Sequence, residues 1–262
     1  MKIITCIKQV PGTNKVEIDP ITGTLKRDSV ASKMNPYDLF ALETAFQIVE
    51  SAGGEVATIS MGPPQAKSVL EESLWMGADR AVLLSDRAFG GADVAATSYC
   101  LSLGIKKMGV YDLILCGKQT TDGDTAQVGP ELAEQLGIEH AANVIEIEDI
   151  SNCNITVKID LDGSVQTIRM AFPCLLTLEK DINTPRLPSY LRKKATTPDQ
   201  IEICSLKSFP DADVGRLGSN GSPTQVERIF SPKARATSPL LFGSADKLSD
   251  DLYRLLRSEK YI

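Results

Sequence analysis

Short apolar runs rich in β-branched residues alternate with longer amphipathic stretches over the first half of the chain. Strands that alternate with helices in this way build a parallel sheet with helices on both faces. The predicted fold class is therefore α/β, with three layers and a mostly parallel sheet, and such sheets bind ligands at the carboxyl ends of their strands. The pattern predicts buried strands at 2–10, 54–62, 80–86 and 111–117, and helices at 38–53, 63–78 and 93–108.

The second half of the chain changes to strand-like patterns. Strands are predicted at 143–148, 154–172 and 174–179, with a hairpin turn at Asp162-Gly163. The turn-rich segment 11–33 predicts a further small hairpin. Three later segments are expected to be an exposed basic loop that runs into a short helix, an irregular arm and a final helix, at 181–198, 209–239 and 245–261.

Composition excludes several classes of protein. Hydrophobic residues make up 42% of the chain and aromatic residues 5%, so we expect an aliphatic core. The net charge of −6 argues against a general nucleic-acid binder, which needs a basic face. No apolar run approaches the roughly 20 residues of a membrane span, and the start of the chain does not resemble a signal peptide, so we expect a cytoplasmic protein.

The residues that commonly bind metals are sparse or scattered. The six cysteines lie far apart without a C-x-x-C pair and are expected to be free thiols, several of them buried in strands. His140 is the single histidine and is expected in a loop just past a helix end. We therefore expect no metal site.

The motif with the clearest chemistry is "GKQTTDGDTAQVGPELAEQLG" at 117–137, which follows the apolar run "YDLILC". It is not a P-loop, and Ala126 and Gln127 stand where a calcium loop needs a ligand and a glycine. The first strand is not followed by the dinucleotide fingerprint G-x-G-x-x-G either. The remaining interpretation is a phosphate cradle, in which Gly117 and Gly123 allow close approach and unusual dihedral angles.

In this interpretation, backbone amides of 123–127 lie at the start of a helix, where N–H groups lack partners, and Thr125 adds a hydroxyl. Asp122 and Asp124 hold the loop by accepting from turn amides and capping the helix, or one of them accepts from a ribose hydroxyl. The alternative is a plain capped helix after a turn. Asn35 and Asp38 precede another helix and form a second candidate element, with simple capping again as the alternative.

Three blocks carry a resemblance to a known family: "KMNPYDLFALETA", the loop motif, and "CLLTLEKDINTPRLPSYLRKKA". Over essentially its full length the chain resembles the beta subunit of electron transfer flavoproteins. The resemblance implies a heterodimer with an alpha subunit. It also implies a nucleotide-binding domain of the adenine nucleotide alpha hydrolase-like type over 1–208, with β-hairpin additions, and a C-terminal arm over 209–262 that packs on the alpha subunit.

Ordinary members of this family hold a structural AMP, whereas the bifurcating branch holds a second FAD. "DGDTAQVGP" is similar to the bifurcating branch, and the small residues Gly123, Thr125 and Ala126 leave room for the diphosphate of FAD. We therefore expect FAD, with AMP as the alternative. By the family pattern, cofactor contacts are expected at Cys6, Asn35, Pro36, Tyr37, Asp38, Met61, Gly117, Lys118, Gln119, Asp122, Gly123, Asp124, Thr125, Ala126, Gln127 and Val128.

The resemblance further implies an electron-transfer subunit of an NADH-dependent flavin-based oxidoreductase complex. NADH would donate a hydride to the flavin held here. The electrons would pass to ferredoxin or flavodoxin and, through an FAD in the alpha subunit, to an acyl-CoA dehydrogenase or enoyl-CoA reductase. No residue is a convincing general acid or base, so no catalytic residue is expected.

Two other functions stay open: a conventional electron carrier with AMP in the same site, and a small nucleotide-sensing protein of the universal-stress type. The third block resembles the family's recognition loop. In that reading Tyr190 and Leu191 bind the partner dehydrogenase, although many members carry leucine where Tyr190 stands. The alternative is an exposed loop with a basic face.

Overall fold

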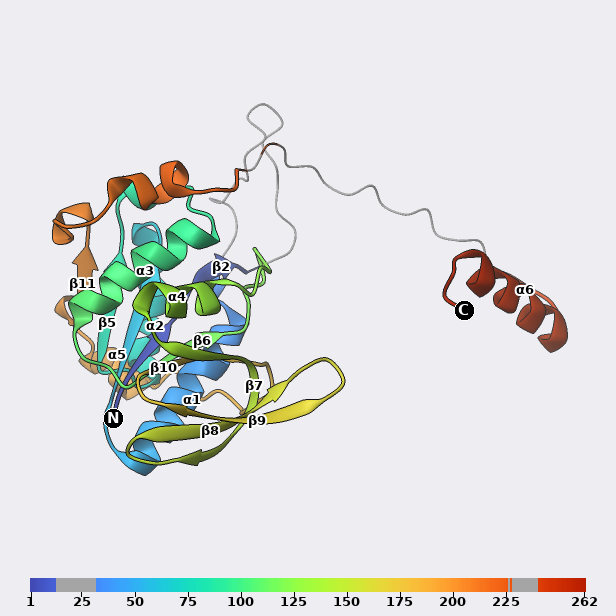
Figure 1. The fold of residues 1–262 in the computed structure, drawn as a ribbon, viewed down its shortest axis with the longest axis horizontal. Helices are drawn as coiled ribbons and strands as arrows, with labels where there is room; N and C mark the ends of the chain where they lie inside the picture. Colours follow the sequence, from blue (N-terminus) through green and yellow to red (C-terminus); the bar gives the residue numbers. More distant parts are fainter. Residues whose placement is uncertain (13–31, 226, 228–239) are drawn as a thin grey trace. The chain divides into compact units, whose positions relative to one another are not determined.

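The computed structural model describes residues 1–12, 32–225, 227 and 240–262 (Figure 1). The chain forms two compact units, Met1–Glu227 and Arg228–Ile262. In the described part of the second unit, helix α6 (Ala245–Ser258) has Ser244 as its N-cap. No helix among the described residues is long and apolar enough to cross a membrane.

A single nine-stranded sheet forms the centre of the first unit, in the order β11-β5-β4-β1-β6-β10-β7-β8-β9. The strands from β11 to β7 are parallel, and β8 and β9 continue the sheet as an antiparallel hairpin. The strands are β1 (Lys2–Cys6), β4 (Glu55–Met61), β5 (Arg80–Leu84), β6 (Leu113–Gly117), β7 (Glu139–Ile150), β8 (Asn154–Asp160), β9 (Val165–Ala171), β10 (Cys174–Leu178) and β11 (Ile201–Cys204).

Four helices cover the sheet and complete the three predicted layers (Figure 1). Along β1, Ile3 packs in the cluster with α1 and α2, whereas Ile4 packs in the cluster with α3 and α4. A strand buried on both faces has no polar side, which explains its nearly continuous apolar run. The helices are α1 (Pro36–Ala52), α2 (Lys67–Met76), α3 (Val94–Met108) and α4 (Val128–Leu136).

The order of the strands creates a switch point. The chain runs from β1 outward through β4 to β5, and then returns to place β6 on the other side of β1. In open parallel sheets, ligands bind in the crevice beyond the carboxyl ends of the strands at such a reversal. Here that crevice lies where β1 and β6 end.

The first predicted strand, 2–10, is wrong in its second half. β1 ends at Cys6, and the carboxylate of Asp38 accepts the N–H of Lys8 at 2.7 Å, so Lys8 does not extend the ladder. The chain then forms β2 (Gln9–Pro11), which pairs antiparallel with β3 (Ser32–Met34). These two strands form the base of the hairpin predicted over 11–33, whose interior, 13–31, lies outside the described residues.

Two other local predictions have clear outcomes. The turn at Asp162-Gly163 is confirmed, because β8 and β9 pair antiparallel on either side of it and both residues have positive φ, 50° and 108°. His140 was expected in a loop, but it lies in β7 and pairs with Leu175 of β10. The parallel pairing begins only two residues after the helix C-cap at Gly137, which leaves no room for a loop.

Residues 209–225 pack within the first unit. Phe209 and Leu217 are buried in the core cluster on the side of α3 and α4. Asp93, the N-cap of α3, accepts hydrogen bonds from both the N–H and the hydroxyl of Thr224, at 2.9 and 2.7 Å. The segment that follows β11 is therefore tied to the start of α3.

Candidate nucleotide-binding site

The loop 118–127 leaves the end of β6 and leads into α4, at the edge of the sheet where ligands of this fold class bind. Cys6 at the end of β1 is in register with Cys116 of β6 and with Ile59 of β4. Met61 ends β4 at the same edge. The parallel strands therefore bring the predicted residues from three separate parts of the sequence to one edge.

Gly117 allows a close approach, but the approaching group is the start of α1. A Cβ atom built on Gly117 would lie 2.5 Å from Oδ1 of Asp38 and 2.6 Å from the backbone carbon of Tyr37. Neither Gly117 nor Gly123 has a positive φ, so these glycines do not adopt the unusual dihedral angles that they would allow. Gly117 thus has a packing reason to lack a side chain.

Asn35 connects α1 to the loop. It is fully buried, and its Nδ2 donates to Oδ1 of Asp38 and to the carbonyl of Gln119, both at 2.9 Å. Its Oδ1 accepts the N–H of Thr121 at 3.2 Å. Although Asn35 is the N-cap residue of α1, its side chain makes no capping bond, so the capping alternative is wrong for this residue. Asn35 instead holds two backbone groups of the loop.

Asp38 is 4% exposed, and its carboxylate accepts from Asn35 and from the backbone of Lys8. Burial is the main influence on the pKa of Asp38 and raises it to about 7, against the opposing hydrogen bonds from Asn35 and Lys8. The start of α1, the end of β1 and the loop therefore meet at one buried carboxyl group. Pro36 opens the helix beside it.

The raised pKa of Asp38 predicts a pH-dependent stability. Between pH 3.8, the ordinary pKa of an aspartate, and about pH 7, the folded chain holds a proton on Asp38 that the unfolded chain has released. This contribution is complete below the unfolded pKa and is lost as the pH rises through the folded pKa. We expect the free energy of unfolding to fall by about 1.4 kcal/mol per pH unit in this window, relative to Asp38→Asn.

Urea denaturation of both proteins from pH 5 to 8 measures the difference. Wild type and Asp38→Asn with parallel pH profiles would show that Asp38 is ionised in the fold throughout this range.

The loop itself is held by side-chain pairs. Nζ of Lys8 lies 2.8 Å from both carboxylate oxygens of Asp122, and Oδ1 of Asp124 accepts from Nε2 of Gln119 at 2.5 Å. Partial burial raises the pKa of Asp122, but the hydrogen bond and charge of Lys8 outweigh it and leave this pKa below its ordinary value. Asp122 and Asp124 were expected to cap α4. The N-cap of this helix is Gln127, which makes no side-chain capping bond, so that expectation is wrong.

The backbone of the loop is partly used and partly free. The N–H groups of Gly123 and Asp124 were expected to bind a ligand. Instead they donate to Thr120, at 3.3 and 3.0 Å. Among the described residues, nothing accepts from the N–H groups of the segment 125–127. Asp124 and Ala126 have φ of 54° and 55°, a region that costs a residue with a Cβ about 1–2 kcal/mol.

Strain of this kind persists only where the surroundings impose it and is common at binding sites. The exposed loop therefore presents amides that no described residue accepts from, in a strained conformation directly before the first turn of α4. Thr125 is exposed, and Ala126 and Val128 are half-buried.

Two further residues shape the site without having been predicted. Lys8 is the partner of Asp122, as described above. Gly129 in the first turn of α4 lies so close to β10 that a Cβ atom there would be 2.3 Å from Cγ2 of Thr177. Lys118, a predicted contact, pairs its ammonium group with Glu179. The sequence shows Gly129 only as a glycine after the loop motif. Its close contact with β10 could not be predicted, because the contact depends on which strand packs against α4.

Tyr190 and Leu191 lie apart from this group of residues, at the start of α5 (Tyr190–Ala195), and are 69% and 77% exposed. The segment before them is fastened to α1. Arg186 donates from Nε to Oε2 of Glu43 at 2.8 Å and from Nη2 to Oε1 at 3.0 Å. Glu43 is 4% exposed, so the segment is anchored by a buried carboxylate.

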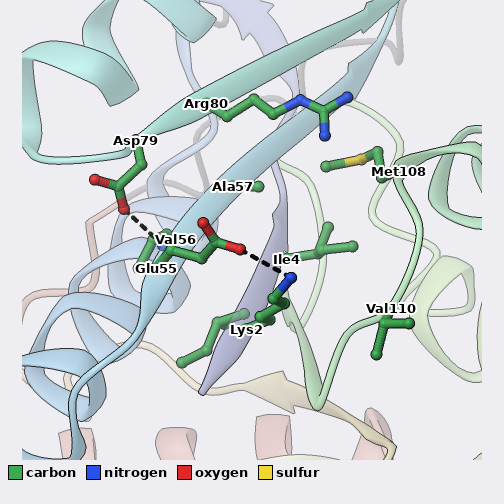
Figure 2. Close-up of a pocket in the computed structure, with 10 residues that line it drawn as sticks. Lys2, Ile4, Glu55, Val56, Ala57, Asp79, Arg80, Met108 and Val110 are labelled. Atoms are coloured by element: carbon green, nitrogen blue, oxygen red, sulfur yellow. Dashed lines mark hydrogen bonds and ion pairs between the residues drawn. The ribbon is translucent and has the colours of Figure 1, made fainter.

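A hollow of about 130 Å³ lies at the opposite edge, among the amino ends of the strands. Its charged side chains already have partners: Asp79 accepts the N–H of Val56 at 2.9 Å, and Lys2 lies 3.5 Å from Glu55 (Figure 2). Arg80 donates to Glu202 outside the hollow, at 2.7 Å. Nucleotides bind such sheets at the other edge. The hollow is therefore not part of the candidate site.

A family model for the electron transfer flavoprotein domain matches residues 22–206, more than half of the chain. The chain belongs to the electron transfer flavoprotein family. It is 43% identical to "Electron transfer flavoprotein subunit beta" of Thermoanaerobacterium thermosaccharolyticum, a match that covers 100% of both chains. It is 43% identical, with 100% of both chains covered, to "Caffeyl-CoA reductase-Etf complex subunit CarD" of Acetobacterium woodii. It is 39% identical to "Protein FixA" of Azorhizobium caulinodans, over 98% of this chain and 99% of the relative.

Within the electron transfer flavoprotein family, these matches support a beta-subunit role in electron transport. The matched region contains β4 to β6, the loop 118–127, α4 and the α5 segment. The loop of the candidate site and the exposed Tyr190 and Leu191 therefore lie within the matched region, whereas Cys6 and Lys8 precede it.

Proposed function

We propose that this electron transfer flavoprotein beta subunit belongs to the bifurcating branch and holds FAD in the crevice where β1 and β6 end. The observation that carries the proposal is the loop 118–127, which presents small side chains and backbone N–H groups without an acceptor among the described residues, at the switch point of the sheet. Gly123, Thr125 and Ala126 leave the space that a diphosphate needs.

The residues at the crevice fit an adenine dinucleotide in chemical type. The N–H groups of 125–127 would donate to phosphate oxygens, with the hydroxyl of Thr125 beside them. A charge-assisted hydrogen bond contributes about 1.5–3 kcal/mol, so a few of them balance much of the cost of association. Because both carboxylate oxygens of Asp38 and the side-chain amide of Asn35 are used within the protein, these residues would shape the loop.

The chemistry that FAD would supply here is to accept a hydride from NADH and to release electrons one at a time. The residues of this chain bind and orient the cofactor and keep the loop in place. The proposed electron acceptors are ferredoxin or flavodoxin and, through an FAD in the alpha subunit, an acyl-CoA dehydrogenase or enoyl-CoA reductase. The relative named as a subunit of a caffeyl-CoA reductase-Etf complex supports a reductase of CoA thioesters as partner. The free cysteines fit a reducing compartment, and we place the complex in the cytoplasm.

A nucleotide count on the heterodimer, co-expressed with the alpha subunit, tests the proposal. Denaturation should release two FAD per heterodimer. One FAD with one AMP would instead identify a conventional electron carrier, in which this chain holds a structural nucleotide.

Gly123→Glu tests the loop. The new carboxylate would face the diphosphate, and like charges in contact weaken binding by at least about tenfold. We expect the purified complex to lose the flavin of this chain, as measured by absorbance after denaturation. Gly123→Gln adds nearly the same volume without charge and should retain more flavin. Equal flavin content in wild type and Gly123→Glu would exclude the loop as the diphosphate site.

We further propose that Tyr190 and Leu191 bind the partner dehydrogenase. Both are large, exposed side chains on a segment that Arg186 fastens to α1. Replacing both with alanine should weaken binding of the dehydrogenase by about 2 kcal/mol or more, measured by calorimetry, and spare NADH oxidation by artificial acceptors. Val110→Ala, at an exposed apolar residue beside the hollow at the amino ends of the strands, is the control. Unchanged binding of the dehydrogenase, or an equal loss of NADH oxidation, would argue against a docking role.

A further inference from the structure

We propose that Lys8 is a phosphate-binding residue of this site, and that its ammonium group leaves Asp122 for the phosphates of the bound nucleotide. This inference rests on the proposed function. It adds a residue that the sequence motifs do not include, because Lys8 belongs to the first strand run and lies 114 residues from Asp122.

The position of Lys8 supports this role. Its backbone N–H is fixed at 2.7 Å from the buried carboxylate of Asp38, two residues beyond the end of β1. Its side chain reaches Asp122 on the loop that follows β6, with Nζ at 2.8 Å from both oxygens. The lysine therefore spans the crevice between the ends of β1 and β6, with a rigid base and a flexible side chain.

The ion pair is suited to exchange its partner. The side chains of Lys8 and Asp122 are 43% and 35% exposed. Ion pairs with this exposure contribute little, because water screens the attraction and two long side chains must be ordered. The diphosphate of FAD carries two negative charges against the one of a carboxylate and offers more acceptor oxygens, so it competes well for the same lysine.

The charged side chains around the loop are mostly acidic, so an anionic ligand needs a cation beside it. Asp122 and Asp124 lie on the loop, and Glu131 lies in the first turn of α4. Of the lysines that the described residues bring to this edge, Lys118 is engaged with Glu179, and that pair is more buried, at 28% and 15% exposed. Lys8 is therefore the lysine that can move to an incoming phosphate at the lower cost.

A purely structural role for Lys8 predicts a different pattern of mutant effects. If Lys8 only braces the loop through Asp122, then Lys8→Met and Asp122→Asn remove the same contact and should weaken nucleotide binding alike. If Lys8 moves to the phosphate, the two changes separate. Lys8→Met removes a phosphate ligand, whereas Asp122→Asn releases the lysine and removes a negative charge from the crevice.

The experiment uses the full chain co-expressed with its alpha subunit and freed of nucleotide. Adenosine, AMP and ADP are titrated into wild type, Lys8→Met, Lys8→Arg and Asp122→Asn by calorimetry. We expect Lys8→Met to weaken ADP and AMP by about tenfold, with adenosine within about twofold. Lys8→Arg should keep most of the ADP affinity, and Asp122→Asn should bind ADP as tightly as wild type or more tightly. Lys106→Met, at an exposed lysine bonded to the carbonyl of Gln135, is the matched control.

The outcomes separate this inference from the proposed function. Equal weakening of ADP by Lys8→Met and Asp122→Asn, or an equal loss for adenosine and ADP in Lys8→Met, overturns the inference alone. Wild type that binds neither AMP nor ADP overturns the proposed function and the inference with it. Should Lys8→Met not fold, weakened ADP binding by Asp122→Asn is sufficient to overturn the inference.

Discussion

Arg186→Ala is expected to lower the free energy of unfolding by about 3–5 kcal/mol, because it leaves the carboxylate of Glu43 buried without a cation. Glu43 is 4% exposed, and Arg186 donates to it from its backbone N–H and from two guanidinium nitrogens. The guanidinium group also lies 4.7 Å from the ring centre of Phe46. Chemical denaturation monitored by circular dichroism measures the change.

Two further variants make this prediction specific. Arg192→Ala removes an exposed arginine from α5 and should change stability by less than about 0.5 kcal/mol. The double variant with Arg186→Leu and Glu43→Leu should recover much of the loss, because an apolar pair needs no charge balance. If Arg186→Ala were as stable as Arg192→Ala, the buried carboxylate of Glu43 would not depend on Arg186, and the prediction would be wrong.

Gly117→Ala is expected to disrupt the candidate site as well as the fold. The added methyl group would lie 2.5 Å from Oδ1 of Asp38 and 2.6 Å from the backbone of Tyr37, so the start of α1 must move. Overpacking of this kind costs about 1–3 kcal/mol. Since Asn35 precedes α1 and holds the loop, we also expect the variant to lose bound nucleotide. Thermal unfolding and nucleotide content of the purified heterodimer measure the two effects.

Gly123→Ala is the matched control. A Cβ atom at Gly123 meets Oγ1 of Thr120 at an ordinary 3.4 Å, and the φ of this glycine is not positive. The variant should keep the stability of wild type within about 0.5 kcal/mol. If Gly117→Ala and Gly123→Ala were equally stable, the contact between α1 and the end of β6 would not be as tight as the structure has it.

Much of the architecture follows from local pattern. The apolar runs at 54–62, 80–86 and 111–117 correspond to β4, β5 and β6, and the three-layer fold follows from their alternation with helices. The loop after β6 could also be picked out from the sequence as a candidate site, because a glycine-containing turn between a parallel strand and a helix lies at the edge where such sheets bind ligands. These features depend on residues that are close in sequence, whose periodicity and turn chemistry act locally.

The partners of the polar side chains required the tertiary structure. Asn35 was expected to contact the cofactor, with helix capping as the alternative; its side chain does not cap the helix and holds the carbonyl of Gln119, which lies 84 residues away. Arg186 and Glu43 are separated by 143 residues, and Lys8 and Asp122 by 114. A side chain with one charge or one amide bonds to whatever the order of the strands brings within about 3 Å. Periodicity along a chain does not contain that order. The fold class could therefore be predicted from the sequence, whereas the side-chain partners at the candidate binding edge could not.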